Sequence, residues 1–164
     1  MKLSFKIFIL AFAVFSGCEE YVNPEVENYI DRLKTGTYNE WDLPAFTPSD
    51  IPALLKYRNE KRIITDFPHN PISSLWGPEC RLGMYVLWTV ESIRAVETGS
   101  KYLIGRFPSQ NPILALKAAP GALVNNEESH LEAARAYNVW WYSIGTTSHK
   151  MGIDPLKDTR YRWH

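Results

Sequence analysis

The stretch of residues 67–96 constrains the fold of this chain most, because its second half has the pattern of a helix that is apolar nearly all round. At 100° per residue, one broad stripe holds Leu82, Tyr85, Val86, Thr89, Val90 and Ile93, and the opposite side holds Cys80, Met84, Leu87 and Trp88. A helix of this kind is either buried on two faces or lies in a membrane. The uncharged run in this helix extends only over residues 82–90, between Arg81 and Glu91, whereas a membrane-spanning helix requires roughly 20 residues. We therefore predict a central packing helix.

The ends of this helix carry recognisable signals. Pro78 and Glu79 suit a first turn, where a missing N–H costs nothing and a carboxylate meets the positive end of the helix dipole. Gly99 is a suitable C-terminal stop. Gly83 lies inside the helix, where glycine costs up to about 1 kcal/mol relative to alanine. We expect Gly83 to let a neighbouring helix approach closely.

The first 18 residues have the pattern of a secretory signal. Lys2 and Lys6 precede an unbroken apolar run at residues 7–15, and small residues follow it. The order Ser16-Gly17-Cys18 resembles the lipobox of bacterial lipoproteins, in which the signal is removed before the cysteine and the cysteine is acylated. This resemblance implies lipidation at Cys18. The alternative is a signal peptide without a lipid, in which Cys18 is incidental.

The lipobox resemblance implies a division of the chain and an address. We expect residues 1–17 to be a cleaved lipoprotein signal peptide and residues 18–23 to be the lipidated N-terminus and tether. From its length and helical patterns, we expect the rest, residues 24–164, to form one helical domain with a docked C-terminal tail. Each buried CH₂ of an acyl chain such as palmitate contributes about 0.8 kcal/mol, so several chains anchor stably. We expect a lipid anchor in the bacterial cell envelope, in the outer membrane rather than the inner one, facing the periplasm or the surface.

The residues next to the expected anchor leave two interpretations open. Glu19 and Glu20 look like the surface-export signals of lipoproteins in Bacteroidetes-type bacteria, and they also suit a solvated tether. After removal of Lys2 and Lys6 with the signal, the chain has sixteen basic and eighteen acidic residues and is slightly acidic. No cluster of basic residues indicates nucleic-acid binding. With Cys18 acylated, Cys80 has no disulfide partner, and we expect it to be a small buried hydrophobic residue.

Three further helices are predicted by caps and apolar spacing. Asn23 and Pro24 begin one that ends at Gly36, a short one occupies residues 51–59, and another occupies residues 127–144. No stretch shows the sustained alternation of half-buried strands. The short apolar runs at residues 63–65 and 102–104 are compatible with extended backbone.

A possible internal sequence repeat refines this prediction, and we call its two copies the echoed segments and the proline-containing turns within them the echoed turns. Residues 63–72 (IITDFPHNPI) resemble residues 103–113 (LIGRFPSQNPI) at an offset of about 40 residues, which is the period of HEAT and armadillo arrays. We therefore predict an all-α fold: an irregular helical-hairpin array, HEAT/armadillo-like, with two to three degenerate repeats. Chance is the alternative, because the chain holds eleven prolines.

Three short motifs resemble those of uncharacterised helical lipoproteins from Bacteroidetes-type genomes. They are Asn-Pro-Ile-Ser-Ser at residues 70–74, Leu-Trp-Thr-Val-Glu-Ser-Ile-Arg at residues 87–94 and Tyr-Arg-Trp at residues 161–163. The resemblance spans about residues 20–164. That family is a domain of unknown function, so the resemblance implies an address and a helical fold but no activity.

The sequence offers little for catalysis or cofactor binding. Glu127 and His130 have the Glu-x-x-His spacing of di-iron bundles, which need two copies, so we expect a surface pair at a helix start. Glu91 and Arg94 suit an ion pair at a solvated edge or between helices. The metal-competent residues of the tail match no known spacing: His149, Asp154, Asp158 and His164. We predict no catalytic residues, no metal and no cofactor.

The remaining candidates face a ligand in our interpretation. They are His69, Asn70, Arg106 and Asn111 around the two echoed turns, and the loop tryptophans Trp41 and Trp76, with Trp163 in the tail. The favoured function is protein binding or scaffolding at the cell envelope, with the membrane as a further partner and no nucleic acid. The alternatives are a glycan-binding accessory lipoprotein in nutrient uptake and, less favoured, a hydrolase of envelope or imported polymers. Whether the chain is an enzyme stays open, with a non-enzyme favoured.

Overall fold

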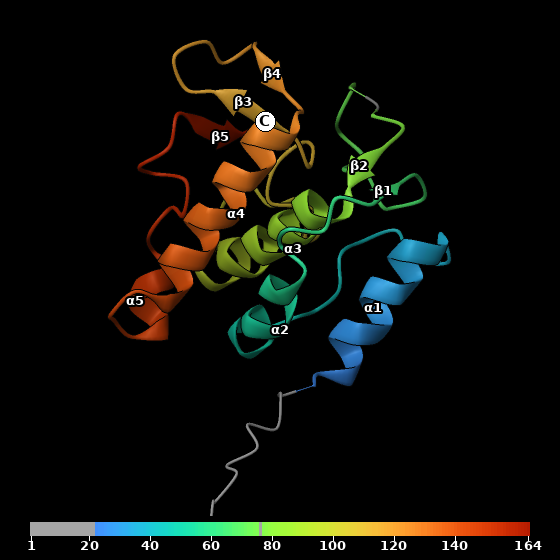
Figure 1. Ribbon diagram of the computed structural model, residues 1–164, viewed down its shortest axis with the longest axis horizontal. Helices are drawn as coiled ribbons and strands as arrows, with labels where there is room; N and C mark the ends of the chain where they lie inside the picture. The colour runs from blue at the N-terminus through green and yellow to red at the C-terminus, as the bar shows by residue number, and fades with distance from the viewer. Residues whose placement is uncertain (1–21, 76) are drawn as a thin grey trace, which may run out of the picture.

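The computed structural model describes residues 22–75 and 77–164. Its centre is α3 (Leu82–Glu97), with α1 (Pro24–Thr35) and α2 (Ile51–Lys56) on one side and α4 (Glu127–Tyr142) on the other (Figure 1). A three-stranded sheet lies near the start of α4, and α5 (Thr147–Met151) lies near its end. Residues 1–21 and Trp76 lie outside the described residues, and so does the predicted lipidation at Cys18.

Local signals explain the limits of α1. The side chain of Asn23 accepts hydrogen bonds from the N–H groups of Glu25 and Val26, and Pro24 occupies the first turn. Gly36 ends the helix at φ +66°, a left-handed conformation that favours glycine. The side chain of Asn23 also donates to Asp50 Oδ1 (2.7 Å), just before α2. The predicted first helix is therefore confirmed, and its cap ties it to the next one.

The burial of α3 matches its sequence. Every residue from Leu82 to Ile93 is buried, and Tyr85, Leu87 and Trp88 expose no surface at all. Full burial of a large apolar side chain stabilises by about 1.5–3 kcal/mol, so α3 holds the core together. The helix begins at Leu82 rather than at Pro78, because Cys80 and Arg81 form a strand first.

The close approach expected at Gly83 is confirmed. A Cβ atom at this position would lie 2.4 Å from Nε2 of His130 on α4 and 2.6 Å from the carbonyl oxygen of Arg58. Both distances are far shorter than van der Waals contact. Only glycine permits α3, α4 and the segment that follows α2 to meet here.

Two small antiparallel sheets contain all the named strands of the described residues. In the first, β1 (Ile63–Ile64) pairs with β2 (Cys80–Arg81), with Ile63 opposite Arg81. In the second, the central strand β3 (Leu114–Leu116) pairs with β4 (Leu123–Val124) and with β5 (Tyr161–Trp163). The end of the chain thus completes a sheet whose other two strands lie about 40 residues earlier.

The prediction of an all-α, HEAT/armadillo-like array with two to three degenerate repeats is wrong. The described residues are 41% helical and 10% strand, in five helices and two antiparallel sheets. The second echoed segment leads into β3 and not into a helix. Strands of two or three residues are too short to show alternation, and the partners in the β1–β2 and β3–β5 pairs lie well apart in sequence. Helical periodicity therefore dominated the prediction.

The two echoed segments nevertheless pack on the same helix. Phe67 and Phe107 are both buried, and their rings lie 5.0 Å from Tyr85 and 5.4 Å from Trp88, respectively. Tyr85 and Trp88 lie 5.6 Å apart, so four rings form a continuous row across α3.

Among the described helices, none has the length and apolar character required to cross a bilayer.

Candidate functional site

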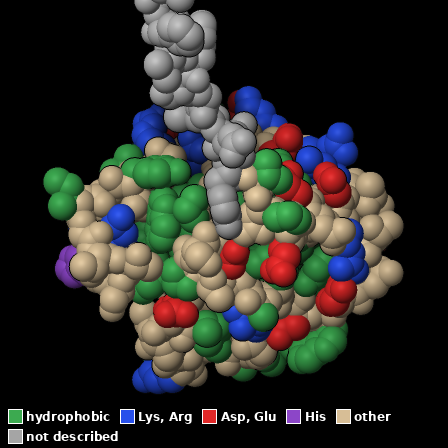
Figure 2. Space-filling view, turned by 90° about the horizontal axis from the view of Figure 1, so that it is seen from below, with side chains coloured by type: hydrophobic (Ala, Val, Ile, Leu, Met, Phe, Trp, Pro, Cys, Tyr) green, Lys and Arg blue, Asp and Glu red, His purple; other side chains and the backbone are tan. Residues whose placement is uncertain are grey.

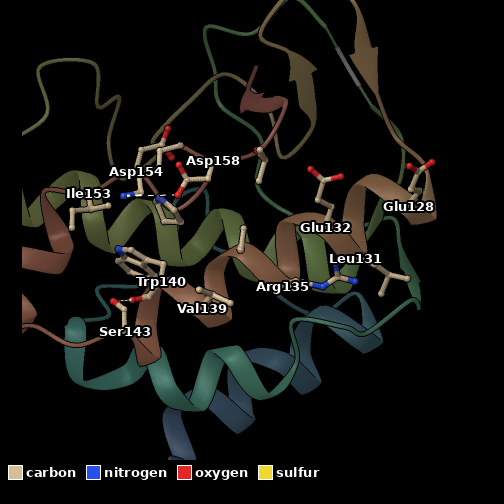
Figure 3. A pocket seen from close by; sticks show the side chains of 14 residues that line it. Glu128, Leu131, Glu132, Arg135, Val139, Trp140, Ser143, Ile153, Asp154 and Asp158 are labelled. Carbon is tan, nitrogen blue, oxygen red and sulfur yellow. Dashed lines mark hydrogen bonds and ion pairs between the residues drawn. The ribbon is translucent and has the colours of Figure 1, made fainter.

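A groove with a volume of about 730 Å³ lies between α4 and residues 153–159. We call it the α4 groove (Figure 3). From α4 it is lined by Glu128, Leu131, Glu132, Arg135, Ala136, Val139 and Trp140, with Ser143 just beyond the helix. The facing wall contributes Ile153, Asp154, Pro155, Lys157, Asp158 and Thr159.

The α4 side of the groove is one complete face of the helix. Its members follow one another at alternating steps of three and one residues, which places them in a stripe along the helix axis. The opposite face of α4 packs on the core through Ala133, Ala134 and Tyr137, none of which is exposed. The helix therefore has a buried face toward α3 and a second, uncovered face toward the groove.

Hydrogen bonds hold the opposite wall in place. Nζ of Lys117, next to β3, donates to the carbonyl oxygens of Leu156 (2.7 Å), Lys157 (2.9 Å) and Thr159 (2.8 Å). The carboxylate of Asp154 accepts from the N–H of Leu156 (2.8 Å), and the Leu156 side chain is buried. An irregular segment is thus fixed by one lysine and one apolar anchor.

The floor of the groove is apolar and partly open to solvent. Trp140 is 6% exposed and donates through Nε1 to the carbonyl oxygen of Lys150 (2.9 Å), which fixes its ring. Val139 beside it is 63% exposed, and Ile153 from the other wall is half-buried. Tyr142 at the end of α4 and Ile144 just beyond it are both exposed.

Carboxylates dominate the rims. Glu128 and Glu132 stand on α4 and Asp154 and Asp158 on the facing segment, against two cationic side chains, Arg135 and Lys157 (Figure 3). Glu128 pairs with Arg160 (2.8 Å) outside the groove, and Lys157 lies 3.9 Å from Asp158. By contrast, the face of the molecule seen in Figure 2 mixes acidic and basic side chains among apolar ones.

The two asparagines predicted to face a ligand also join the two echoed turns. Asn70 is buried, and its Nδ2 donates to the carbonyl oxygen of Ser109 (2.9 Å). Asn111 is buried too, and its amide lies 3.1 Å from Ser73 Oγ. In the orientation that pairs every polar atom, Asn111 Oδ1 accepts from His164 Nδ1 (3.0 Å) and Nδ2 donates to the Leu75 carbonyl oxygen (3.0 Å). The structure thus brings these residues together as a junction with the end of the chain.

His69 and Arg106 belong to the two echoed segments. The His69 ring lies 4.5 Å from that of Phe67, and burial lowers the pKa of His69. The backbone N–H of Arg106 donates to the Asp42 carboxylate (2.9 Å), and its guanidinium donates to the Phe46 carbonyl oxygen (3.1 Å). The guanidinium Nε of Arg106 is buried without a partner. Arg106 therefore holds the loop between α1 and α2.

The tryptophans differ from one another in exposure. Trp41 is 74% exposed in the loop between α1 and α2. Trp163 in β5 donates through Nε1 to the hydroxyl of Tyr137 (2.8 Å), so its polar edge points inward. Trp76 lies outside the described residues. None of the described ligand candidates lines the α4 groove.

The expected Glu127–His130 surface pair is wrong. Glu127 is exposed and pairs with Lys61 (2.6 Å), whereas His130 exposes no surface and has its Nε2 2.7 Å from the Arg58 carbonyl oxygen. Cys80 is buried as expected, and burial raises the pKa of its thiol to about 12. In the described residues, no three His, Cys, Asp or Glu side chains gather as metal ligands would.

The sequence analysis predicted a helix at residues 127–144 but did not identify the groove along it. The signal was present: Leu131, Ala136 and Val139 stand at helical spacing on the side that also carries Glu132 and Arg135. Charged residues in this stripe made it look like an ordinary solvated face. Asp154 and Asp158, considered as metal ligands from the sequence, belong to its second wall.

Comparison with known proteins adds a family but no activity. No curated protein and no solved structure matches this chain at a significant level. A family model does match, over residues 20–164, which include every helix and strand described above. The chain belongs to that family, a domain of unknown function (DUF4943).

Proposed function

We propose that this protein is a lipid-anchored component of the bacterial cell envelope that binds a segment of another protein in the α4 groove. The observation that carries the proposal is the uncovered face of α4, which runs the length of the helix over an apolar floor. Concave apolar surfaces with a few placed polar groups are the usual binding sites of proteins. Aromatic residues fixed in such sites, as Trp140 is here, commonly contribute most of the binding energy.

The sequence supports the location. A charged start, a short apolar run and Ser16-Gly17-Cys18 resemble a lipoprotein signal, and the family match begins two residues after Cys18. We propose attachment through acyl chains on Cys18, in the outer membrane rather than the inner one. Growth with an alkyne-tagged palmitate should label the full chain, and Cys18→Ser should abolish the label. Labelling that persists in Cys18→Ser would contradict the anchor.

Site-specific crosslinking in intact cells tests the binding site. A photoreactive amino acid in place of Val139, 63% exposed in the groove, should give a discrete adduct with one partner. The same amino acid in place of Tyr102, 72% exposed and outside the groove, is the matched control. Val139→Asp, which places a carboxylate in the groove, should remove an adduct formed from a photoreactive residue at Ser143. Equal adducts at the Val139 and Tyr102 positions would contradict a site in the groove.

One observation favours a second candidate function, glycan binding. The indole of Trp41 is 74% exposed, and a flat exposed ring is a stacking surface for sugars. A neighbouring cavity of about 440 Å³ contains the polar groups of Arg32, Tyr38 and Glu40. Titration with envelope and plant glycans should quench Trp fluorescence in the wild type and not in Trp41→Ala. A response of the same size in both would remove this candidate.

A further inference from the structure

The backbone of the groove's second wall is already hydrogen-bonded. The carbonyl oxygens of Leu156, Lys157 and Thr159 accept from Lys117, and the N–H groups of Lys157 and Thr159 donate to the carbonyl oxygens of Asp154 and Leu156, respectively. An extended peptide binds by adding a strand to a free row of such groups. The opposite wall is a helix, whose backbone is bonded internally. The occupant must therefore be recognised through its side chains.

The shape of the α4 wall suits a second helix. Its stripe of Glu128, Leu131, Glu132, Arg135, Ala136, Val139 and Trp140 is the ridge pattern against which another helix packs. Ala136 lies at its middle, where a small side chain lets a helix axis approach. At 1.5 Å per residue, α4 offers a face about 24 Å long, which matches an occupant of about 16 residues.

The charges that line the groove predict the charge of the segment that binds in it. Four carboxylates face two cationic groups across the groove, and two of the carboxylates stand on each wall. Neither Glu132 on α4 nor Asp154 on the facing wall forms an ion pair within 4 Å among the described residues, although Arg160 and Arg94 lie near enough to interact with them electrostatically. An occupant with lysine or arginine on both flanks of its apolar stripe meets complementary charge on both sides.

We infer that the α4 groove takes a cationic amphipathic α-helix from the partner protein, which rests on the proposed function. Its apolar side chains, spaced at i, i+3, i+4 and i+7, lie over Val139, Trp140 and Ile153. Its basic side chains face Glu132 on one wall and Asp154 on the other. The apolar stripe supplies affinity, and the carboxylates supply orientation and discrimination.

Designed peptides test the inference without knowledge of the partner. Two fluorescent 16-residue peptides share one apolar stripe, and their flanks carry either lysine or glutamate. The cationic peptide should bind the full chain at least about tenfold more tightly, with affinity that falls as salt rises. A cationic peptide with a central proline, which breaks the helix, should lose binding. Equal binding of the proline peptide would overturn a helical occupant.

Charge reversal provides the matched protein variants. The double variant Glu132→Lys with Asp154→Lys should weaken binding of the cationic peptide and strengthen binding of the anionic peptide, because both positions line the groove. Glu79→Lys with Glu97→Lys reverses two exposed carboxylates outside the α4 groove and should leave the preference unchanged. Circular dichroism confirms that each variant is folded. An unchanged preference in the groove variant would overturn the charge argument.

The outcome separates this inference from the proposed function. If neither peptide binds but the photoreactive residue at position 139 still forms its adduct in cells, the groove binds a protein and the cationic helix is wrong. If peptides and adduct both fail, the protein-binding groove itself is wrong. Binding of the cationic peptide, its loss in Val139→Asp and the swap on charge reversal together support the helix.

Discussion

At the scale of single residues, His130 is buried in a way that makes folding sensitive to pH. It exposes no surface, its Nε2 lies 2.7 Å from the Arg58 carbonyl oxygen, and its Nδ1 has no partner. The carbonyl accepts only from a protonated nitrogen, which assigns the neutral ring with its proton on Nε2. Burial lowers the pKa of His130, and the charges of Arg81 and Lys61 act in the same direction. The hydrogen bond to the Arg58 carbonyl and the charge of Glu127 oppose this lowering without reversing it.

This lowered pKa predicts a loss of stability in weak acid. Above the unfolded pKa of about 6.5, both states are neutral at this residue and the stability is fully present. As the pH falls below that value, the unfolded chain binds a proton before the folded one, so the free energy of unfolding decreases. Urea denaturation at steps between pH 7.5 and 5 should show a smaller decrease in His130→Gln than in wild type. His149→Gln, at an exposed position, should keep the wild-type decrease, and an unchanged slope in His130→Gln would contradict the assignment.

The contact at Gly83 predicts the cost of a single methyl group. Gly83→Ala adds a Cβ 2.4 Å from His130 Nε2 and 2.6 Å from the Arg58 carbonyl oxygen, and one of these contacts is backbone. Overpacking of this kind costs about 1–3 kcal/mol, which outweighs the gain of up to about 1 kcal/mol from helix propensity. Gly121→Ala, with no atom within 4 Å, is the control and should be nearly neutral. A Gly83→Ala protein as stable as wild type in urea would show that the three elements can separate at no cost.

At the scale of elements, β5 joins the end of the chain to the core. Tyr161 is 1% exposed, and its strand pairs with β3 at Leu116. Tyr161→Ala should therefore destabilise by about 3–5 kcal/mol, as truncations of large buried aromatic side chains do. Tyr102→Ala, at 72% exposure, should change the free energy of unfolding little. A small effect at Tyr161 in thermal and urea unfolding would mean that β5 contributes little to the folded state.

The elements that sequence predicted well are those fixed by local chemistry. Asn23 and Gly36 limit α1 because capping involves residues a few positions away. The start of α3 was misplaced because the N–H groups of Leu82 and Gly83 donate to the carbonyl oxygens of Arg62 and Glu60, a contact that no local pattern encodes. The strands were missed partly for this reason, since each is two or three residues long and the pairs β1–β2 and β3–β5 join segments far apart in the sequence.

The candidate site was harder to predict than the helices. Asn70 and Asn111 were candidates for facing a ligand, and in the structure they bond the backbone and side chains of two turns that meet, a contact between distant segments that no local pattern encodes. The α4 groove exists because residues 153–159 return beside α4, and that return depends on Lys117 and on burial of Leu156. Which face of an amphipathic helix stays uncovered is decided by such distant packing.

At the scale of the whole molecule, one polar network links α3 to α4, α5 and β5. Glu91 and Arg94 form an ion pair with side chains only 9% and 19% exposed, and Tyr137 on α4 donates to Glu91 (2.8 Å). Arg94 also donates to the Met151 carbonyl oxygen (3.2 Å), and Trp163 donates to Tyr137 (2.8 Å). Burial, together with the charge of Glu91, raises the pKa of Tyr137, so its hydroxyl stays a donor. The expected pair at a solvated edge or between helices is thus a link between four elements.

A double-mutant cycle measures what this network contributes. Arg94→Leu alone leaves the Glu91 carboxylate poorly solvated and without its cation. Breaking a buried ion pair in this way costs about 3–5 kcal/mol of stability. This is an upper value here, because the Arg94 side chain is partly exposed. Glu91→Gln added to Arg94→Leu removes the stranded charge and keeps an acceptor for Tyr137, so the double variant should be more stable than Arg94→Leu. The same cycle on Arg32 and Glu40, whose side chains are 32% and 51% exposed, should show little coupling because water screens exposed charges. If Arg94→Leu and the double variant unfold at the same urea concentration, neutralising the Glu91 charge does not contribute to stability. Hydrogen bonding to Met151 and Tyr137 alone would then join the helices.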